Sequence, residues 1–116
     1  MQDFQLLLGE PSAGVLELRL FGEVDMATVV PLREATRTAV ASRDYQCLVF
    51  DLSGVTFMDS SGLHVLAEAH RKMIAAGGGT RVVCGSGSLR KIFELTALDR
   101  VLTIVGERDD ALVAAA

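Results

Sequence analysis

A short uninterrupted apolar run near the middle of the chain constrains the fold more than any other feature. Cys47 to Phe50 are all apolar, and the run ends in Asp51-Leu52. Such a run is typical of a strand buried on both faces, as in a parallel sheet that helices cover on both sides. Segments with apolar residues at helical spacing lie before and after it. The chain is therefore expected to be an α/β protein whose parallel strands are joined by right-handed crossovers.

The rest of the chain continues this alternation of strands and helices. Two apolar runs around a turn at residues 9–14 predict a β-hairpin, which makes the first strand an antiparallel edge. Thr28 is expected to cap the first helix, and the glycines at 77–79 to end the second. The expected strands are residues 4–8, 15–20, 47–52, 80–84 and 101–105, and the expected helices are residues 29–42, 60–76, 89–96 and 108–114. They predict a single domain over residues 1–116, with a mixed, mostly parallel sheet of about four to five strands and about four helices.

Composition and charge exclude several classes of partner. The 116 residues are 50% apolar, which suffices for the core of one domain and is too much for a disordered chain. A net charge of −4 disfavours binding to nucleic acid or to an anionic membrane. The N-terminus does not read as a signal peptide, and no window approaches the ~18 apolar residues of a membrane span. We expect a cytoplasmic protein.

Nothing in the sequence predicts a metal or a cofactor. Cys47 and Cys84 lie inside apolar runs without a second cysteine or a histidine at ligand spacing, so both are expected to be buried thiols. The Gly-Ser-Gly-Ser segment at residues 85–88 lacks the third glycine of a dinucleotide site and the lysine of a P-loop. A helix cap at Ser86 or Ser88 explains that segment more simply.

The junction between the central strand and the second long helix carries the candidate functional residues. Asp59, Ser60, Ser61 and Gly62 follow one another there. Each of the three polar side chains can accept hydrogen bonds from the amides of a helix start, so a capping role explains them. Gly62 costs about 1 kcal/mol of helix stability relative to alanine, which suggests that another group approaches the backbone closely. The residues alone leave both interpretations open.

The same junction resembles the signature of STAS domains, and in particular of bacterial anti-sigma factor antagonists. Residues 51–63 read Asp-Leu-Ser-Gly-Val-Thr-Phe-Met-Asp-Ser-Ser-Gly-Leu. Three further segments match the family in order: the turn at residues 20–25, the glycine-rich turn and strand at 77–84, and the helix and turn at 89–98. One position departs from the pattern, because His64 stands where the family commonly has a second glycine.

The resemblance implies a partner-switching cycle in which the chain itself is not an enzyme. The unphosphorylated antagonist binds an anti-sigma factor and so releases a sigma factor for transcription. The anti-sigma factor is usually also a serine kinase, and it phosphorylates the serine after the motif aspartate, which is Ser60 here. A serine phosphatase restores the active form. The identity of both factors, the inducing signal and the phosphorylation of Ser61 stay open.

A partner-binding patch is expected at one edge of the sheet. The carboxyl ends of parallel strands share an edge, so the turn at residues 22–25 should lie beside the start of the second helix. The expected patch, mostly polar and acidic, consists of Asp25, Thr28, Asp59, Ser60, Ser61, Gly62 and His64. Its counterpart on the anti-sigma factor should be basic. A phosphoserine of about −1.5 to −2 charge beside Asp59 would oppose docking without unfolding the domain.

Two alternatives were considered. A serine hydrolase is suggested by the proximity of Asp59, Ser60 and His64, but the G-x-S-x-G elbow is missing and the spacing does not suit an acid–histidine–serine relay. The stronger alternative is a STAS scaffold or regulatory module of a stress-signalling, lipid-transport or anion-transport complex. Several such modules lack the phosphorylatable serine, which this chain retains.

Overall fold

Five strands form one mixed sheet in the order β1-β2-β3-β4-β5. β1 is antiparallel to β2, and the other neighbours are parallel. The computed structural model describes residues 3–115. The elements are β1 (Gln5–Ser12), β2 (Val15–Val24), α1 (Val29–Ser42), β3 (Cys47–Met58), α2 (Ser60–Ala75), β4 (Gly79–Val83), α3 (Ser88–Leu95), the 3-10 helix η1 (Leu98–Arg100), β5 (Ile104–Val105) and α4 (Arg108–Ala115). The α/β class and the antiparallel edge strand are confirmed.

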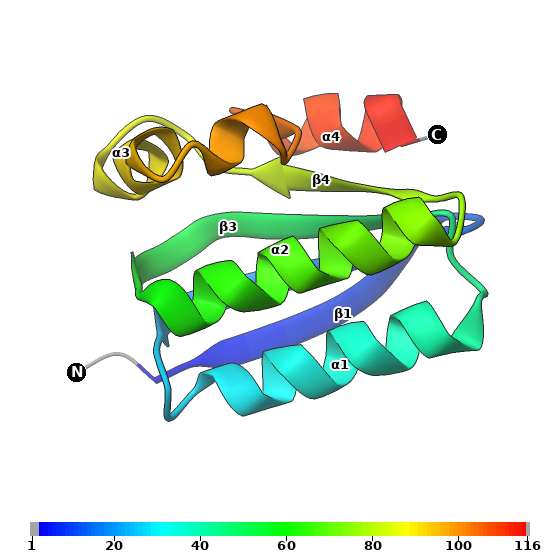
Figure 1. Ribbon diagram of the computed structural model, residues 1–116, viewed down its shortest axis with the longest axis horizontal. Helices are drawn as coiled ribbons and strands as arrows, with labels where there is room; N and C mark the ends of the chain where they lie inside the picture. Colours follow the sequence, from blue (N-terminus) through cyan, green and yellow to red (C-terminus); the bar gives the residue numbers. More distant parts are fainter. Residues whose placement is uncertain (1–2, 116) are drawn as a thin grey trace.

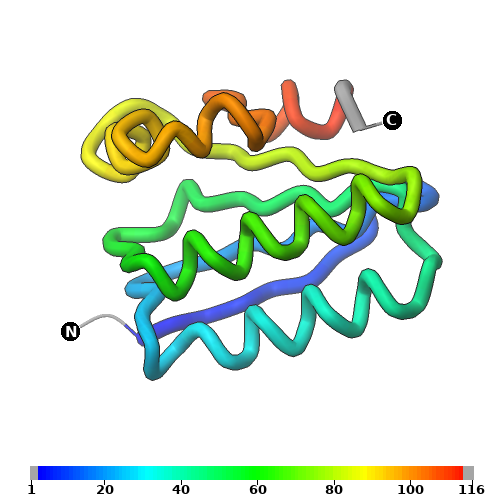
Figure 2. Tube along the Cα trace, viewed as in Figure 1, coloured from blue at the N-terminus to red at the C-terminus, as the bar shows by residue number. Residues whose placement is uncertain are grey.

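The helices form two layers around the sheet. α1 and α2 lie side by side on one face, as both the ribbon and the tube show (Figures 1 and 2). The main core lies under them and includes Phe50 and Leu66, both fully buried. α4 covers part of the opposite face, where its Ala111 packs with Val49 and Val83. Because strand side chains alternate between faces, β2, β3 and β4 contribute to both layers.

Strand β2 shows how this alternation places an ion pair. Leu16, Leu18 and Leu20 face α1 and α2 and are buried. Glu17 faces the other way and is also buried, because Arg108 at the start of α4 binds its carboxylate. The two hydrogen bonds measure 2.5 and 2.8 Å. α4 is therefore held to the sheet by charge as well as by apolar packing.

Three strands are longer than the sequence suggested. β1 continues to Ser12, β2 to Val24 and β3 to Met58, whereas ends were expected at residues 8, 20 and 52. The pairing of β2 with β3 contains two register shifts, one after Arg19 and one after Gly22. These irregularities break the alternation that marks a strand in a sequence, so the second halves of the strands were not evident.

The last strand is shorter than expected. Only Ile104 and Val105 pair with β4, whereas a strand over residues 101–105 was expected. Leu102 donates its amide to the carbonyl of Leu98 at 2.7 Å and buries its side chain, so it continues the turn of η1. Leu102 is therefore buried by that turn and not by a sheet ladder, whereas Val101 is exposed.

Two of the predicted helix ends, the end of α2 and the start of α3, differ in outcome. The amides of Gly77 and Gly78 bind carbonyls of the last turn of α2 at 3.0 and 2.7 Å, and Gly77 has φ +85°, so the glycines end the helix as predicted. The serine cap of α3 was wrong. Gly87 occupies the N-cap position at φ 126°, and neither Ser86 nor Ser88 caps the helix.

Both cysteines lie in the interior, as expected. Cys47 and Cys84 are free and buried, and burial raises the pKa of both thiols. Within residues 3–115, no helix has the length and apolar composition needed to cross a membrane.

Candidate functional site

Two loops and two helix starts meet at one end of the sheet. β2 and β3 are parallel neighbours, and α1 and α2 both begin beyond their carboxyl ends, at the left of Figure 1. The amide of Asp59 donates to the carbonyl of Val24 at 3.0 Å, which joins the end of one strand to the end of the other. The prediction that the turn at residues 22–25 lies at the same end as residues 59–64 is confirmed.

Asp59 is the N-cap of α2 and the centre of this junction. Its carboxylate accepts hydrogen bonds from the hydroxyl of Ser61 and from the amide of Ser61, the latter at 2.9 Å. The Ser61 hydroxyl is the main cause that lowers the pKa of Asp59 below its ordinary value, and the amides of Ser61, Gly62 and Met26 add to it against partial burial. The charged carboxylate thereby caps the start of α2.

The β2–α1 loop is ordered by its own side chains. Asp25 accepts from the amides of Ala27 and Thr28 at 2.9 and 3.0 Å. The hydroxyl of Thr28 accepts from the amide of Asp25 and donates to the carbonyl of Glu23, at 2.9 and 2.8 Å. Thr28 occupies the N-cap position of α1 as predicted, but its side chain makes no capping hydrogen bond. Its hydroxyl instead makes its hydrogen bonds within the loop, to Glu23 and Asp25.

The two serines of the junction differ in accessibility. Ser60 is the first residue of α2 and is exposed to solvent. Ser61 is partly buried, and its hydroxyl is bound to Asp59. Among the residues that the structure describes, Ser60 has no hydrogen-bond partner for its hydroxyl. A macromolecule that approaches this end of the sheet therefore finds the hydroxyl of Ser60 unbound and that of Ser61 bound to Asp59.

Gly62 faces the interior and not the solvent. A Cβ atom at this position would lie 2.6 Å from Cγ of Met58 and 2.9 Å from a methyl group of Val24. The sequence suggested that a glycine here admits a close approach to the backbone. The group that approaches comes from inside the molecule, since Met58 and Val24 pack under the first turn of α2.

His64 lies one helical turn after Ser60 and is exposed. Within residues 3–115, the Asp59 carboxylate is bound by serine and amide groups and by no histidine, so no acid–histidine–serine relay is formed. In the same part of the chain, no three His, Cys, Asp or Glu side chains converge as metal ligands would.

The match to a family model determines the family. The model of the STAS domain covers residues 10–111, which include both loops of the site. The chain belongs to the STAS domain family. The mixed sheet with its antiparallel β1 edge is thus the framework of a STAS domain, and Ser60 lies at its β3–α2 junction.

Proteins similar to this STAS domain have a more specific name. The anti-sigma-F factor antagonist RsfB of Mycobacterium tuberculosis is 35% identical over 99 residues, which are 85% of this chain and 80% of that protein. An anti-sigma F factor antagonist of Paenibacillus polymyxa is 32% identical over 104 residues, or 89% and 88% of the two chains. The crystal structure of an anti-sigma factor antagonist from Mycobacterium paratuberculosis has a TM-score of 0.88 at 34% identity, and covers 97% of this chain and 94% of that one.

The STAS domain also exposes apolar side chains at this end, which sequence analysis missed. Met26, in the β2–α1 loop, is 79% exposed, and Phe57, near the end of β3, is 50% exposed. Phe57 pairs with Glu23 across the sheet, so their side chains share one face. The position of Met26, an apolar residue inside a polar turn, was a signal that could have identified it. Phe57 gave no such signal, because β3 was expected to end at Leu52.

Proposed function

We propose that this STAS domain is an anti-sigma factor antagonist that is switched off by phosphorylation of Ser60. The unphosphorylated domain binds an anti-sigma factor in the cytoplasm and so releases a sigma factor. The bound anti-sigma factor is the serine kinase, and a serine phosphatase reverses the modification. The domain catalyses no reaction of its own. Its similarity to proteins named anti-sigma factor antagonists supports this role.

The observation that carries the choice of Ser60 is the unequal state of the two serine hydroxyls. Ser60 is exposed at the first turn of α2, whereas the hydroxyl of Ser61 is bound to Asp59. In the kinase reaction a serine oxygen attacks the γ-phosphorus of ATP, its proton leaves, and ADP departs. Ser60 can present its oxygen without breaking a contact of the domain. Ser61 would first have to leave the Asp59 carboxylate.

The phosphate acts by its charge and leaves the fold as it is. Asp59 already accepts hydrogen bonds from the amide and the hydroxyl of Ser61, so these groups are not free to hold a phosphate on Ser60. A phosphoserine of about −1.5 to −2 charge therefore stays at the surface, next to an ionised carboxylate. Such a cluster opposes the docking of a partner through repulsion and the cost of removing water from the charges.

The binding surface combines an apolar centre with charged surroundings. Met26 and Phe57 are exposed apolar side chains, so removing them from water costs little free energy. Such residues often supply much of the affinity of an interface. Glu23 and Asp25 add negative charge at the same end of the sheet. A basic partner surface fits this arrangement, and the rate of association should fall as salt rises.

The test is a phosphorylation and binding assay with each candidate anti-sigma kinase of the same organism. The wild-type domain is incubated with kinase and ATP, and phosphosites are mapped by mass spectrometry. Ser60→Ala and Ser61→Ala are compared with Ser86→Ala, which changes an exposed serine outside the site. We expect modification to disappear only in Ser60→Ala. Titration calorimetry should show binding for Ser60→Ala and weakened binding for the phosphorylated wild type.

Two results of this assay would contradict the proposal in different ways. Phosphorylation that persists in Ser60→Ala and maps to Ser61 would move the switch by one residue. Phosphorylated and unphosphorylated domains that bind the anti-sigma factor equally well would remove the switch altogether.

A further inference from the structure

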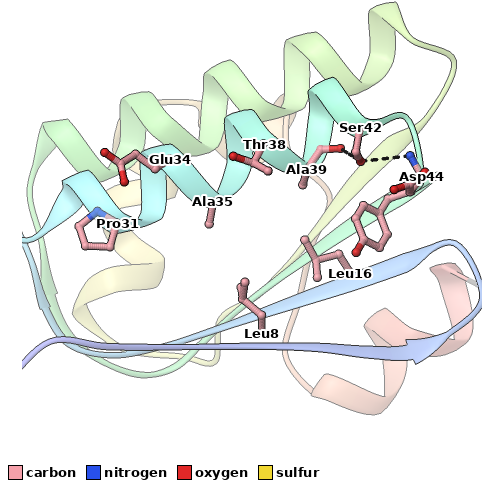
Figure 3. Close-up of a pocket in the computed structure, with 10 residues that line it drawn as sticks. Leu8, Leu16, Pro31, Glu34, Ala35, Thr38, Ala39, Ser42 and Asp44 are labelled. Carbon is pink, nitrogen blue, oxygen red and sulfur yellow. Dashed lines mark hydrogen bonds between the residues drawn. The ribbon is translucent and has the colours of Figure 1, made fainter.

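An open groove runs between α1 and the β1–β2 hairpin. Its volume is about 490 Å³, and none of the residues of the proposed switch lines it. Figure 3 shows Leu8 and Leu16 rising from the hairpin toward Ala35 and Ala39 of α1. The floor and walls of the groove are therefore largely aliphatic. Covering an apolar surface of this kind with another molecule is favourable in free energy.

The groove borders a free sheet edge. β1 is the last strand of the sheet and pairs only with β2. Two of its side chains, Leu7 and Leu8, are 51% and 56% exposed. Exposed apolar edge strands are templates for pairing with a further strand, and proteins usually protect them. Pro11 and the irregular pairing between Gly9 and Ser12 protect only the far end of β1.

The charged residues that line the groove are both acidic. Glu34 and Asp44 belong to its lining, and no Lys or Arg does. The carboxylate of Glu10 lies near the phenol of Tyr45, another lining residue, and raises its pKa. Among the described residues, none of these three carboxylates takes part in an ion pair. The groove therefore favours a positively charged occupant.

We propose that this groove binds an extended, basic and apolar segment of a partner protein, which adds as a strand to the free edge of β1. Main-chain hydrogen bonds to β1 supply part of the affinity, and alternate side chains of the segment enter the groove. The segment's apolar side chains cover Leu8 and Ala35. Its Lys or Arg side chains reach Glu34 and Asp44. This docking site is separate from the switch at Ser60 and does not depend on it.

The spacing of the carboxylates defines the segment further. On α1, Ser42 lies eight residues after Glu34, a rise of about 12 Å along the helix, and Asp44 lies two residues beyond Ser42. An extended chain advances ~3.3 Å per residue, so basic residues at positions i and i+4 span the same distance. The side chain at i+2 points the same way and falls between them. The expected pattern is therefore basic-x-apolar-x-basic.

Other occupants fit the structure less well. A second copy that pairs through β1 would bring the same acidic groups together across a two-fold axis. Small-molecule sites enclose most of their ligand, whereas Leu8, Pro31 and Thr38 at the mouth of this groove are exposed. An extended basic segment avoids the repulsion between the acidic groups of two copies, and it does not need an enclosed pocket.

The test uses a blocked synthetic peptide, Gly-Lys-Thr-Leu-Thr-Lys-Gly, added to the ¹⁵N-labelled full chain. Amide chemical shifts should change along residues 5–9 and 34–45, and the affinity should decrease as salt increases. A peptide with Glu in place of Lys should not bind. Glu34→Lys should weaken binding by about tenfold or more, as expected for reversing one close charge pair. Glu94→Lys, an exposed change on α3, is the matched control and should leave binding unchanged.

Further variants decide between this site and the others. Leu8→Lys places a charge inside the groove and should abolish binding, with folding checked by circular dichroism. Ser60→Asp should bind the peptide as the wild type does. Shift changes confined to residues 22–28 and 57–64 would overturn the proposal, because the peptide would then occupy the switch surface. Sedimentation of the free chain as a dimer that Leu8→Lys dissociates would also overturn it, in favour of a second copy.

Discussion

The ion pair between α4 and the sheet permits a quantitative prediction. Glu17 is a charged residue at 4% exposure, and Arg108 binds both of its carboxylate oxygens, at 2.5 and 2.8 Å. Arg108→Met keeps an unbranched apolar side chain and removes the guanidinium. Glu17 then remains on the buried side of the sheet without its partner. Leaving one charge of a buried pair uncompensated costs about 3–5 kcal/mol.

The exposure of Arg108 reduces that figure. Its side chain is 41% exposed, so water reaches the pair from one side and compensates part of the loss. We therefore expect Arg108→Met to lower the free energy of unfolding by about 2–3 kcal/mol, between the values for surface and buried pairs. In a domain of this size 1 kcal/mol corresponds to ~4–8 °C, so the melting temperature should fall by about 10–20 °C.

Urea unfolding followed by circular dichroism measures this change, and a second variant isolates its cause. Glu17→Met combined with Arg108→Met removes both charges and should regain most of the stability, because apolar side chains often replace buried ion pairs at little cost. Arg100→Met, an exposed change in η1, is the control and should stay within about 0.5 kcal/mol of wild type. The reasoning is refuted if Arg108→Met also stays within that range, or if the double variant is no more stable than Arg108→Met.

Three further predictions concern the switch region. Carboxyl NMR titration should find the pKa of Asp59 below its ordinary value, and Ser61→Ala should raise that pKa. The cap contributes stability that is fully present above pH ~4 and is lost as the pH falls through the lowered pKa. Asp25→Lys and His64→Glu should each weaken anti-sigma factor binding in calorimetry, and unchanged binding in both would place the interface elsewhere. Gly62→Val should lower the free energy of unfolding by about 1–3 kcal/mol in urea titrations, because its side chain overlaps Met58.

The architecture followed from the sequence because its signals were local and repeated. The apolar run that begins β3 at Cys47 and the helical spacing of α1 and α2 each have one simple explanation. Helix ends at Gly77 and Asp59 were also evident, since their residue types suit those positions. Strand lengths were less evident. The pairing of β2 with β3 is irregular beyond Arg19 and Gly22, and a pattern with period two cannot show an irregular strand.

For the candidate site, the sequence indicated where residues lie in the fold more than which contacts they make. Ser60 and Asp59 were placed by the cap pattern and by the family signature, and the structure brings Asp25 to the same end of the sheet. Sequence alone could not divide the two serines, because the difference depends on which hydroxyl Asp59 accepts. It also could not assign Gly62 to the interior, since that requires the positions of side chains from two strands.

The arrangement around Asp59 bears on the proposed switch, in which a phosphate on Ser60 would change binding while the domain stays folded. Asp59 is joined to the end of β2 through its amide, which donates to Val24, and to Ser61 through its carboxylate, so the junction keeps its shape through contacts that do not involve the Ser60 hydroxyl. Modification of Ser60 breaks none of these contacts. It adds charge to a surface whose apolar members, such as Met26, must lose water on binding. The energetic effect is therefore concentrated in the complex with the partner and is nearly absent from the free domain.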